Sequence, residues 1–101
     1  MTADWDNELT DDLVRTLRTL PTAEATKQFL RDLLTEAEMR EFGLRWRVAV
    51  MLEQEVPYSE IERSTGMSSA TIARISKWLK SGTGGYRLAL KRRKQSPARR
   101  A

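Results

Sequence analysis

One stretch of the sequence, PYSEIERSTGMSSATIARISKWLKSG at positions 57–82, constrains the fold more than any other. Its first half has the features of a short helix. Ser59 and Glu62 have the spacing of a capping box, in which each side chain binds a backbone N–H that the first helical turn leaves unpaired. That box predicts a helix beginning at about Glu60. Gly66 ends it, because glycine reaches the left-handed conformation without a Cβ clash.

The second half of the stretch predicts another helix, which Ser68 or Ser69 can cap and Gly82 can end. Apolar residues at spacings of three and four give this helix one apolar stripe: Ile72, Ile75, Trp78 and Leu79. A small core is expected to join the two helices through Ile61, Met67 and Ile72. We interpret Trp78 as a core residue of this stripe. Two short helices with a tight turn between them, over residues 58–81, predict a helix-turn-helix.

The outer face of the second helix carries small and basic side chains: Ser69, Ala70, Ala73, Arg74 and Lys77. The second helix of a helix-turn-helix enters the major groove of DNA. Small side chains allow the backbone to approach base edges, and Arg74 and Lys77 can reach a guanine or a phosphate. An ordinary helical hairpin remains the alternative, since two helices joined by a glycine are common. The residues expected at DNA are Ser59, Ser68, Ser69, Ala70, Thr71, Ala73, Arg74 and Lys77, followed by Lys91, Arg92, Arg93 and Lys94.

Charge is divided along the chain in a way that the net charge of +4 conceals. Residues 1–62 contain 14 acidic and 7 basic side chains, whereas residues 63–101 contain 11 basic and no acidic ones. Basic charge confined to the helix-turn-helix and the segment after it suits a surface that binds a polyanion. A basic tail that is merely solvated would give the same composition, so the inference depends on the motif and the charge together.

Composition excludes several classes of protein. The chain of 101 residues has the length of one small domain, and it contains no cysteine and no histidine. Disulfides, thiolate metal sites and the commonest general base are therefore absent, and we expect no enzyme, no metal and no cofactor. No apolar run approaches the roughly 20 residues that cross a bilayer, and the acidic N-terminus does not resemble a signal peptide. We expect a cytoplasmic protein with no membrane partner.

The rest of the chain predicts four further helices, which gives an all-α fold of six. Residues 1–8 are expected to form a loose acidic arm, 9–94 the helical domain and 95–101 a disordered basic tail. Thr10 is expected to cap the first helix, whose leucines extend to Leu20 before Pro21. The second helix is expected to begin after Thr22. The third, long helix is expected to begin at the capping box of Thr35 and Glu38 and to end at about Glu55. The last helix is expected to run from Tyr86 to about Lys94. Inward positions of the long helix include Met39, Phe42, Trp46, Ala49, Val50 and Leu52, and its Gly43 suggests that another helix crosses closely.

The apolar stripes of the N-terminal helices are broad relative to the small helix-turn-helix. They include Leu13, Leu17, Phe29, Leu30 and Leu33. A monomer would expose a sizeable apolar patch, so we expect a homodimer formed through these helices. Two recognition helices related by a two-fold axis could then address two half-sites about 34 Å apart.

The run LLTEAEMREFGLRWRVAVML, followed by GMSSATIARISKWLKSGTGGYRLAL, resembles the tryptophan repressor superfamily, and more closely its YerC/YecD-like branch. The resemblance covers about residues 22–90. It implies an intertwined, all-helical homodimer that represses transcription, with Ser69, Ala70 and Ala73 lying against bases. It also implies that Arg45 and Arg74 match the two arginines that enclose the amino-acid corepressor.

The residues of the corepressor pocket differ from those of that family. The candidate pocket here is Arg45, Arg74, Ile75 and Trp78, where Ile75 and Trp78 replace the glycine and serine that give the ligand its room. We therefore expect DNA binding without tryptophan gating, although an amino-acid corepressor stays open as an alternative. The overall hypothesis is a sequence-specific regulator of transcription that binds double-stranded DNA. The rival hypotheses are a helical adaptor and a nonspecific RNA-binding protein.

Overall fold

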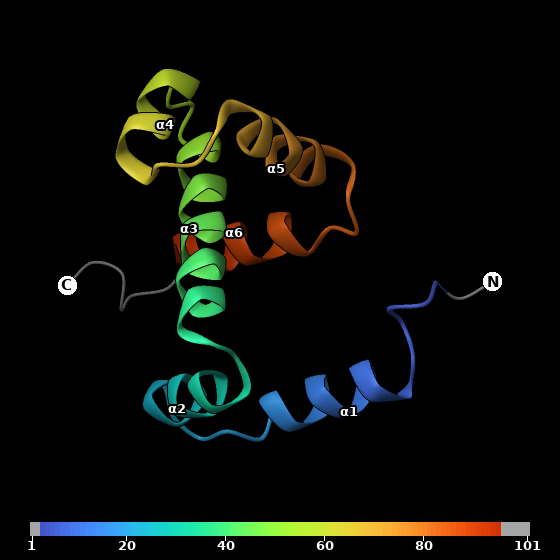
Figure 1. The fold of residues 1–101 in the computed structure, drawn as a ribbon. Helices are drawn as coiled ribbons and strands as arrows, with labels where there is room; N and C mark the ends of the chain where they lie inside the picture. Colours follow the sequence, from blue (N-terminus) through green and yellow to red (C-terminus); the bar gives the residue numbers. More distant parts are fainter. Residues whose placement is uncertain (1–2, 96–101) are drawn as a thin grey trace. The chain divides into compact units, whose positions relative to one another are not determined.

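The computed structural model describes residues 3–95, and the expected tail lies outside the described residues apart from its first position. Within these residues the chain forms six helices and no strand, so the predicted all-α, six-helix fold is confirmed (Figure 1). The chain divides into two compact units, residues 1–39 and 40–101. The helices are α1 (Glu8–Leu17), α2 (Ala23–Leu33), α3 (Glu36–Glu53), α4 (Tyr58–Thr65), α5 (Ser69–Ser81) and α6 (Gly85–Gln95).

The first helix begins earlier than the sequence suggested. Asn7, not Thr10, is the N-cap, and its Oδ1 accepts hydrogen bonds from the backbone N–H groups of Leu9 at 2.9 Å and Thr10 at 3.1 Å. The Thr10 hydroxyl donates instead to the carbonyl oxygen of Trp5. The described part of the expected loose arm is therefore tied to the first turn of α1 through Trp5. The helix also ends at Leu17, three residues before the expected end at Leu20.

Two predicted caps are confirmed. The Thr22 hydroxyl accepts a hydrogen bond from the backbone N–H of Ala25 at 3.0 Å and so caps α2. At the start of α3, the Thr35 Oγ1 accepts from the Glu38 N–H at 3.1 Å, and a Glu38 carboxylate oxygen accepts from the Thr35 N–H at 2.8 Å. This reciprocal pair satisfies two backbone donors that the first turn leaves open. The helix ends at Glu53, slightly before the expected Glu55.

The hydrophobic core of the second unit lies where α3, α4 and α5 meet. Its buried residues are Val48, Ala49, Ile61, Ile72 and Ile75. Met67 packs against this cluster, so the predicted contact among Ile61, Met67 and Ile72 is confirmed. In Figure 1, α4 and α5 lie at the C-terminal end of α3, and α6 passes beside α3 below α5. The Trp46 ring of α3 and the Tyr86 ring of α6 stack with centroids 6.3 Å apart and planes 15° apart.

The helix-turn-helix consists of α4 and α5, but the capping box expected at Ser59 is wrong. Tyr58 is already helical, Pro57 is the N-cap, and no side chain caps the helix. Pro57 has φ −61° and ψ 147°, an extended conformation that the fixed φ of proline allows, and its lack of an N–H leaves no donor to satisfy at that position. Gly66 ends α4 with φ 76°, the left-handed conformation expected of it. Ser68, the first of the two candidate caps, caps α5.

Several residues expected inside are exposed. Phe42 of α3 is 51% exposed because the core forms around the second half of that helix, at Val48 and after. Apart from its own helix backbone and chain neighbours, no atom lies within 4 Å of a Cβ built on Gly43, so the expected close crossing is absent from the described chain. Leu88 and Ala89 of α6, for which the sequence made no prediction of burial, are exposed as well, Leu88 to 61%. These side chains are available for contacts that a single chain does not make.

Candidate nucleic-acid interface

The outer face of α5 presents the residues that the sequence assigned to DNA. Ser69, Ala70, Ala73, Arg74 and Lys77 are all exposed, while Ile72, Ile75 and Ser76 on the opposite side of the helix are buried. The small core beneath α5 thus fixes which face points outward. A helix with small side chains near its N-terminus and two cations farther along can approach base edges and backbone phosphates.

The N-terminus of α5 is held by Ser68. Its hydroxyl accepts the backbone N–H of Thr71 at 3.2 Å and donates to the Thr71 Oγ1 at 3.1 Å. Thr71 is half-buried, so of the expected contact residues it is the least accessible on α5. Ser59 is exposed on α4. Ser68 lies in the turn between the two helices, whereas Ser59 lies in the first turn of α4, and an exposed hydroxyl at either place can reach a phosphate.

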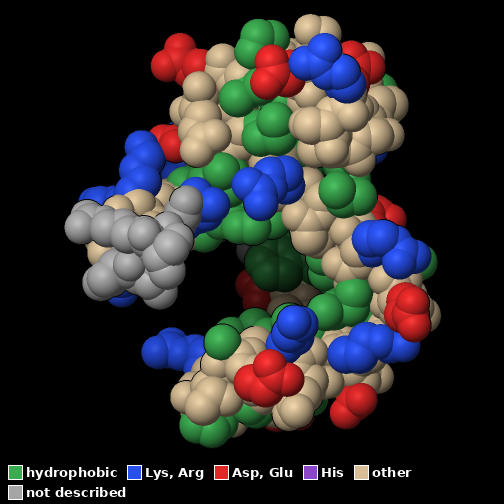
Figure 2. Space-filling view, turned by 90° about the vertical axis from the view of Figure 1, so that its left-hand side faces the viewer, with side chains coloured by type: hydrophobic (Ala, Val, Ile, Leu, Met, Phe, Trp, Pro, Cys, Tyr) green, Lys and Arg blue, Asp and Glu red, His purple; other side chains and the backbone are tan. Residues whose placement is uncertain are grey.

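The basic residues of α6 differ in what they contact. Lys91 and Arg92 are exposed, and Arg93 is half-buried. The Lys94 Nζ lies 2.6 Å from a carboxylate oxygen of Glu53 at the end of α3. Lys94 is therefore partly neutralised inside the chain, whereas Lys91 and Arg92 have their charge directed to solvent. In Figure 2, Lys and Arg side chains lie exposed among hydrophobic ones on the face shown.

The four residues of the candidate ligand pocket do not gather in one place. A cavity of about 230 Å³ is lined by Arg74, Lys77, Trp78 and Ser81 of α5. Ile75 is buried in the core, and Arg45 is exposed and pairs with Glu41 at 2.7 Å. The structure thus places Arg74 and Trp78 together.

The interpretation of Trp78 as a core residue is wrong for the single chain, because its side chain is 55% exposed. The buried stripe of α5 continues from Ile75 to Ser76 and the half-buried Leu79. Trp78 lies one turn after Arg74 and shares the exposed face of that residue. Trp78 follows Ile75 by three residues, and this spacing suggested that Trp78 is buried. The buried stripe of α5 instead passes through Ser76 and Leu79 and leaves Trp78 exposed.

The sequence did not predict that Arg87 of α6 contacts the last turn of α5. Arg87 of α6 donates from its guanidinium to the carbonyl oxygens of Leu79, at 3.0 Å, and of Lys80. These are among the carbonyls that the end of a helix leaves unpaired. The signal in the sequence was Arg87, a basic residue shortly after Gly82, because a cation there can bind the last carbonyl groups of the helix.

Metal and membrane sites receive no support from the described residues. Between residues 3 and 95, no group of three or more potential metal ligands comes together. In the same part of the chain, no helix combines the length and the apolar character needed to span a bilayer.

With this geometry established, comparison with known proteins decides the family. The model of the Trp repressor protein family matches residues 8–94. The chain belongs to the Trp repressor family. It is 36% identical over 86 residues to the uncharacterized protein YerC of Bacillus subtilis, covering 85% of this chain and 83% of that protein. It is also 41% identical over 68 residues to a Trp operon repressor homolog of Actinobacillus succinogenes, covering 66% of this chain and 67% of that protein.

A solved structure agrees with the family assignment. The crystal structure of a TrpR-like protein from Eubacterium eligens matches with a TM-score of 0.82 and 28% sequence identity, covering 87% of this chain and 91% of that one. The predicted resemblance to the tryptophan repressor superfamily is therefore confirmed, as is its fold. Trp repressor family members are non-enzymatic regulators, and membership indicates a DNA-binding regulator.

Proposed function

We propose that this Trp repressor family member is a cytoplasmic, sequence-specific DNA-binding protein that represses transcription as a homodimer. The observation that carries the proposal is the exposed face of α5, where Ser69, Ala70 and Ala73 leave room for base edges beside Arg74 and Lys77. Ser68 and Thr71 add polar groups at the start of α5, and Ser59 adds one at the start of α4. Base contacts from α5 supply sequence preference, and phosphate contacts supply the larger part of nonspecific affinity.

Exposed apolar side chains support the homodimer. Leu9, Leu13 and Val14 of α1 are 82%, 36% and 48% exposed, and Leu33 of α2 is 50% exposed. None of the residues of α1 or α2 is buried in the single chain. An isolated protein rarely leaves two amphipathic helices uncovered in this way. A second copy that covers these faces would also bring two α5 helices onto one DNA duplex.

We also propose that DNA binding needs no amino-acid corepressor. The bulk of Ile75 is packed in the core, and the Trp78 indole forms a wall of the cavity beside Arg74. Arg45 is engaged with Glu41 on its own helix. An indole ligand held between Arg45 and Arg74 would therefore have to displace the Glu41 carboxylate from Arg45 and move the Trp78 indole.

The proposal is tested by an electrophoretic shift with double-stranded DNA over a series of salt concentrations. We expect salt-sensitive binding, and a steep loss of affinity in Arg74→Glu because a cation facing DNA becomes an anion. Lys27→Glu, a matched reversal at an exposed position of α2, should retain binding. Absence of salt-sensitive binding to any duplex would favour the adaptor hypothesis, and effective competition by single-stranded RNA would favour the RNA-binding hypothesis.

A further inference from the structure

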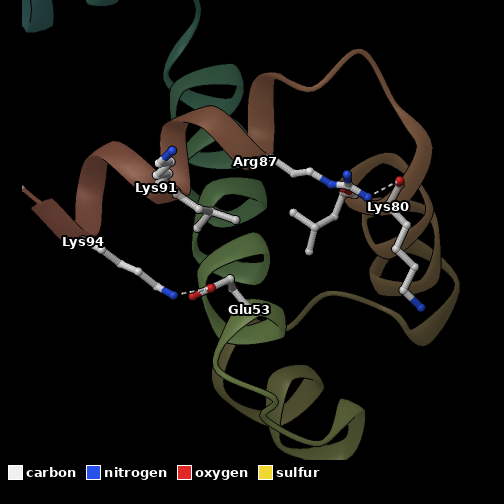
Figure 3. A pocket seen from close by; sticks show the side chains of 7 residues that line it. Glu53, Lys80, Arg87, Lys91 and Lys94 are labelled. Atoms are coloured by element: carbon white, nitrogen blue, oxygen red, sulfur yellow. Dashed lines mark hydrogen bonds and ion pairs between the residues drawn. The ribbon is translucent and has the colours of Figure 1, made fainter.

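A groove in the second unit lies between α5, α6 and the end of α3 (Figure 3). Its volume is about 330 Å³. It shares no residue with the cavity beside Arg74 and Trp78, and the helix-turn-helix face of α5 does not line it. Ligand pockets of proteins begin at roughly this volume, so the groove has room for a small molecule only.

The groove carries an excess of positive charge. Lys80, Arg87, Lys91 and Lys94 line it, and Glu53 is its only acidic lining residue among those described. Glu53 is held by Lys94 at 2.6 Å, as the dashed line in Figure 3 shows. Lys80 and Lys91 have no carboxylate partner within residues 3–95. The charge of these two lysines is left for a ligand or for solvent.

Arg87 gives the groove a fixed wall. Its guanidinium is held by the carbonyl oxygens of Leu79 and Lys80, so its position is set by the end of α5. A guanidinium has five N–H donors, and these two contacts leave some of them for an anion. Unlike a lysine on a solvated surface, this cation is oriented before any ligand arrives, which lowers the entropy cost of binding.

The remaining lining is apolar. Leu90 is 5% exposed, and Leu79 is half-buried. A DNA phosphate needs accessible cations and gains nothing from leucine side chains in a concave site. A ligand with both a charged group and an apolar body would gain from both parts of the lining, because pockets of this kind combine apolar walls with a few polar anchors.

We propose that this groove is a binding site for a small organic anion, a carboxylate or phosphate ester with an apolar body. The anionic group lies beside Arg87 and Lys91 of α6, and the apolar body rests on Leu79 and Leu90. Since these residues belong to α5 and α6, the ligand contacts both helices together. The site requires no DNA, so its test is independent of the proposed regulatory function.

The first test is a titration of the full-length protein with phenyl phosphate, followed through the methyl NMR signals of Leu79 and Leu90. Inorganic phosphate and phenol are titrated separately, because each carries only one half of the proposed ligand chemistry. We expect saturable shifts of both leucines, with phenyl phosphate binding about tenfold or more tightly than either half, a difference of about 1.4 kcal/mol. Equal affinity for inorganic phosphate would overturn the proposal in favour of a bare phosphate site, and so would the absence of saturable shifts.

The second test compares two charge reversals. Lys91→Glu places an anion at the groove and should weaken phenyl phosphate binding by about tenfold or more. Lys27→Glu makes the same change on an exposed position of α2 and should leave the affinity unchanged. Thermal unfolding followed by circular dichroism verifies that both variants fold. If folded Lys91→Glu bound phenyl phosphate as tightly as the unaltered protein, the assignment of the site would be wrong.

Discussion

The Trp78 indole lies against the backbone of Gly82, the residue that ends α5. A Cβ placed on Gly82 would come within 2.6 Å of the Trp78 Cε3 and 2.5 Å of the Trp78 carbonyl oxygen. Gly82 has φ −83°, so no left-handed conformation demands glycine there. Glycine is favoured at position 82 because the Trp78 atoms leave no space for a Cβ. The end of α5 and the exposed Trp78 side chain are therefore coupled through a contact that leaves no space for a Cβ at position 82 unless neighbouring atoms shift.

Gly82→Ala should consequently destabilise the protein by about 1–3 kcal/mol, the usual effect of forcing extra atoms into a filled site. The free energy of unfolding in urea measures this change. Gly85→Ala is the matched control, because the nearest atom to a Cβ there is the Thr83 Oγ1 at 3.9 Å. It should be neutral or slightly stabilising. Equal effects of the two substitutions would show that the contact with Trp78 does not restrict position 82.

The caps of the two helices of the helix-turn-helix should respond differently to alanine. Ser68→Ala removes the acceptor for the Thr71 N–H and should cost about 1 kcal/mol of stability. Ser59→Ala should change the stability little, because the N-cap of α4 is Pro57 and no side chain bonds to its first turn. Urea unfolding of the two variants checks this order. The opposite order would restore the capping box that the sequence suggested at Ser59 and Glu62.

The dimer should depend on the exposed leucines of α1. Light scattering of the unaltered protein at micromolar concentration should return twice the mass of one chain. The double variant Leu9→Asp, Leu13→Asp should return the mass of one chain, because two buried and unpaired carboxylates would oppose association. Leu88→Asp alters a leucine that is 61% exposed on α6, in the other unit, and should stay dimeric. A monomeric unaltered protein would contradict the proposed assembly.

The ion pair between Glu53 and Lys94 should limit the affinity for DNA. Glu53→Gln keeps the shape of the side chain and frees the charge of Lys94, so binding to all duplexes should strengthen alike. The slope of log affinity against log salt should steepen by up to about 0.9 if one phosphate contact is gained. Lys91→Gln and Arg92→Gln should flatten this slope, again without changing sequence preference.

Ala70→Leu should instead alter sequence preference, since Ala70 lies on the outer face of α5. Changed preference in the α6 variants, together with unchanged preference in Ala70→Leu, would reverse this assignment of faces.

Tryptophan should have no effect on operator affinity. A ligand shifts a conformational equilibrium only by binding one state better, and here Ile75 is packed in the core and the Trp78 indole forms a wall of the cavity beside Arg74. Titration of L-tryptophan into the protein and its DNA checks this expectation. Trp78→Ser should weaken binding or make it responsive to an indole. A clear increase in the affinity of the unaltered protein on adding tryptophan would return it to the ligand-gated members of the family.

Local patterns sufficed for much of the fold. The Thr35 and Glu38 box, the Thr22 cap and the Gly66 stop depend on contacts within a few residues, and all three occur as expected. The cap of α1 was missed because Thr10 has a competing partner, the Trp5 carbonyl, that spacing alone does not show. The capping box at Ser59 failed for a similar reason, since a proline two residues earlier already starts the helix.

The sequence by itself determined the helices, the division of charge and the outward face of α5, because each follows from short-range periodicity and from side-chain chemistry. Only the tertiary structure decided which apolar residues are covered. Trp78 and Phe42 fit an apolar pattern but are exposed, since the packing of α3 against α4 and α5 selects a narrower stripe than the pattern allows. The groove lined by Glu53, Lys80 and Arg87 likewise required the fold, because residues up to 34 positions apart become neighbours only when α6 packs beside α3 and α5.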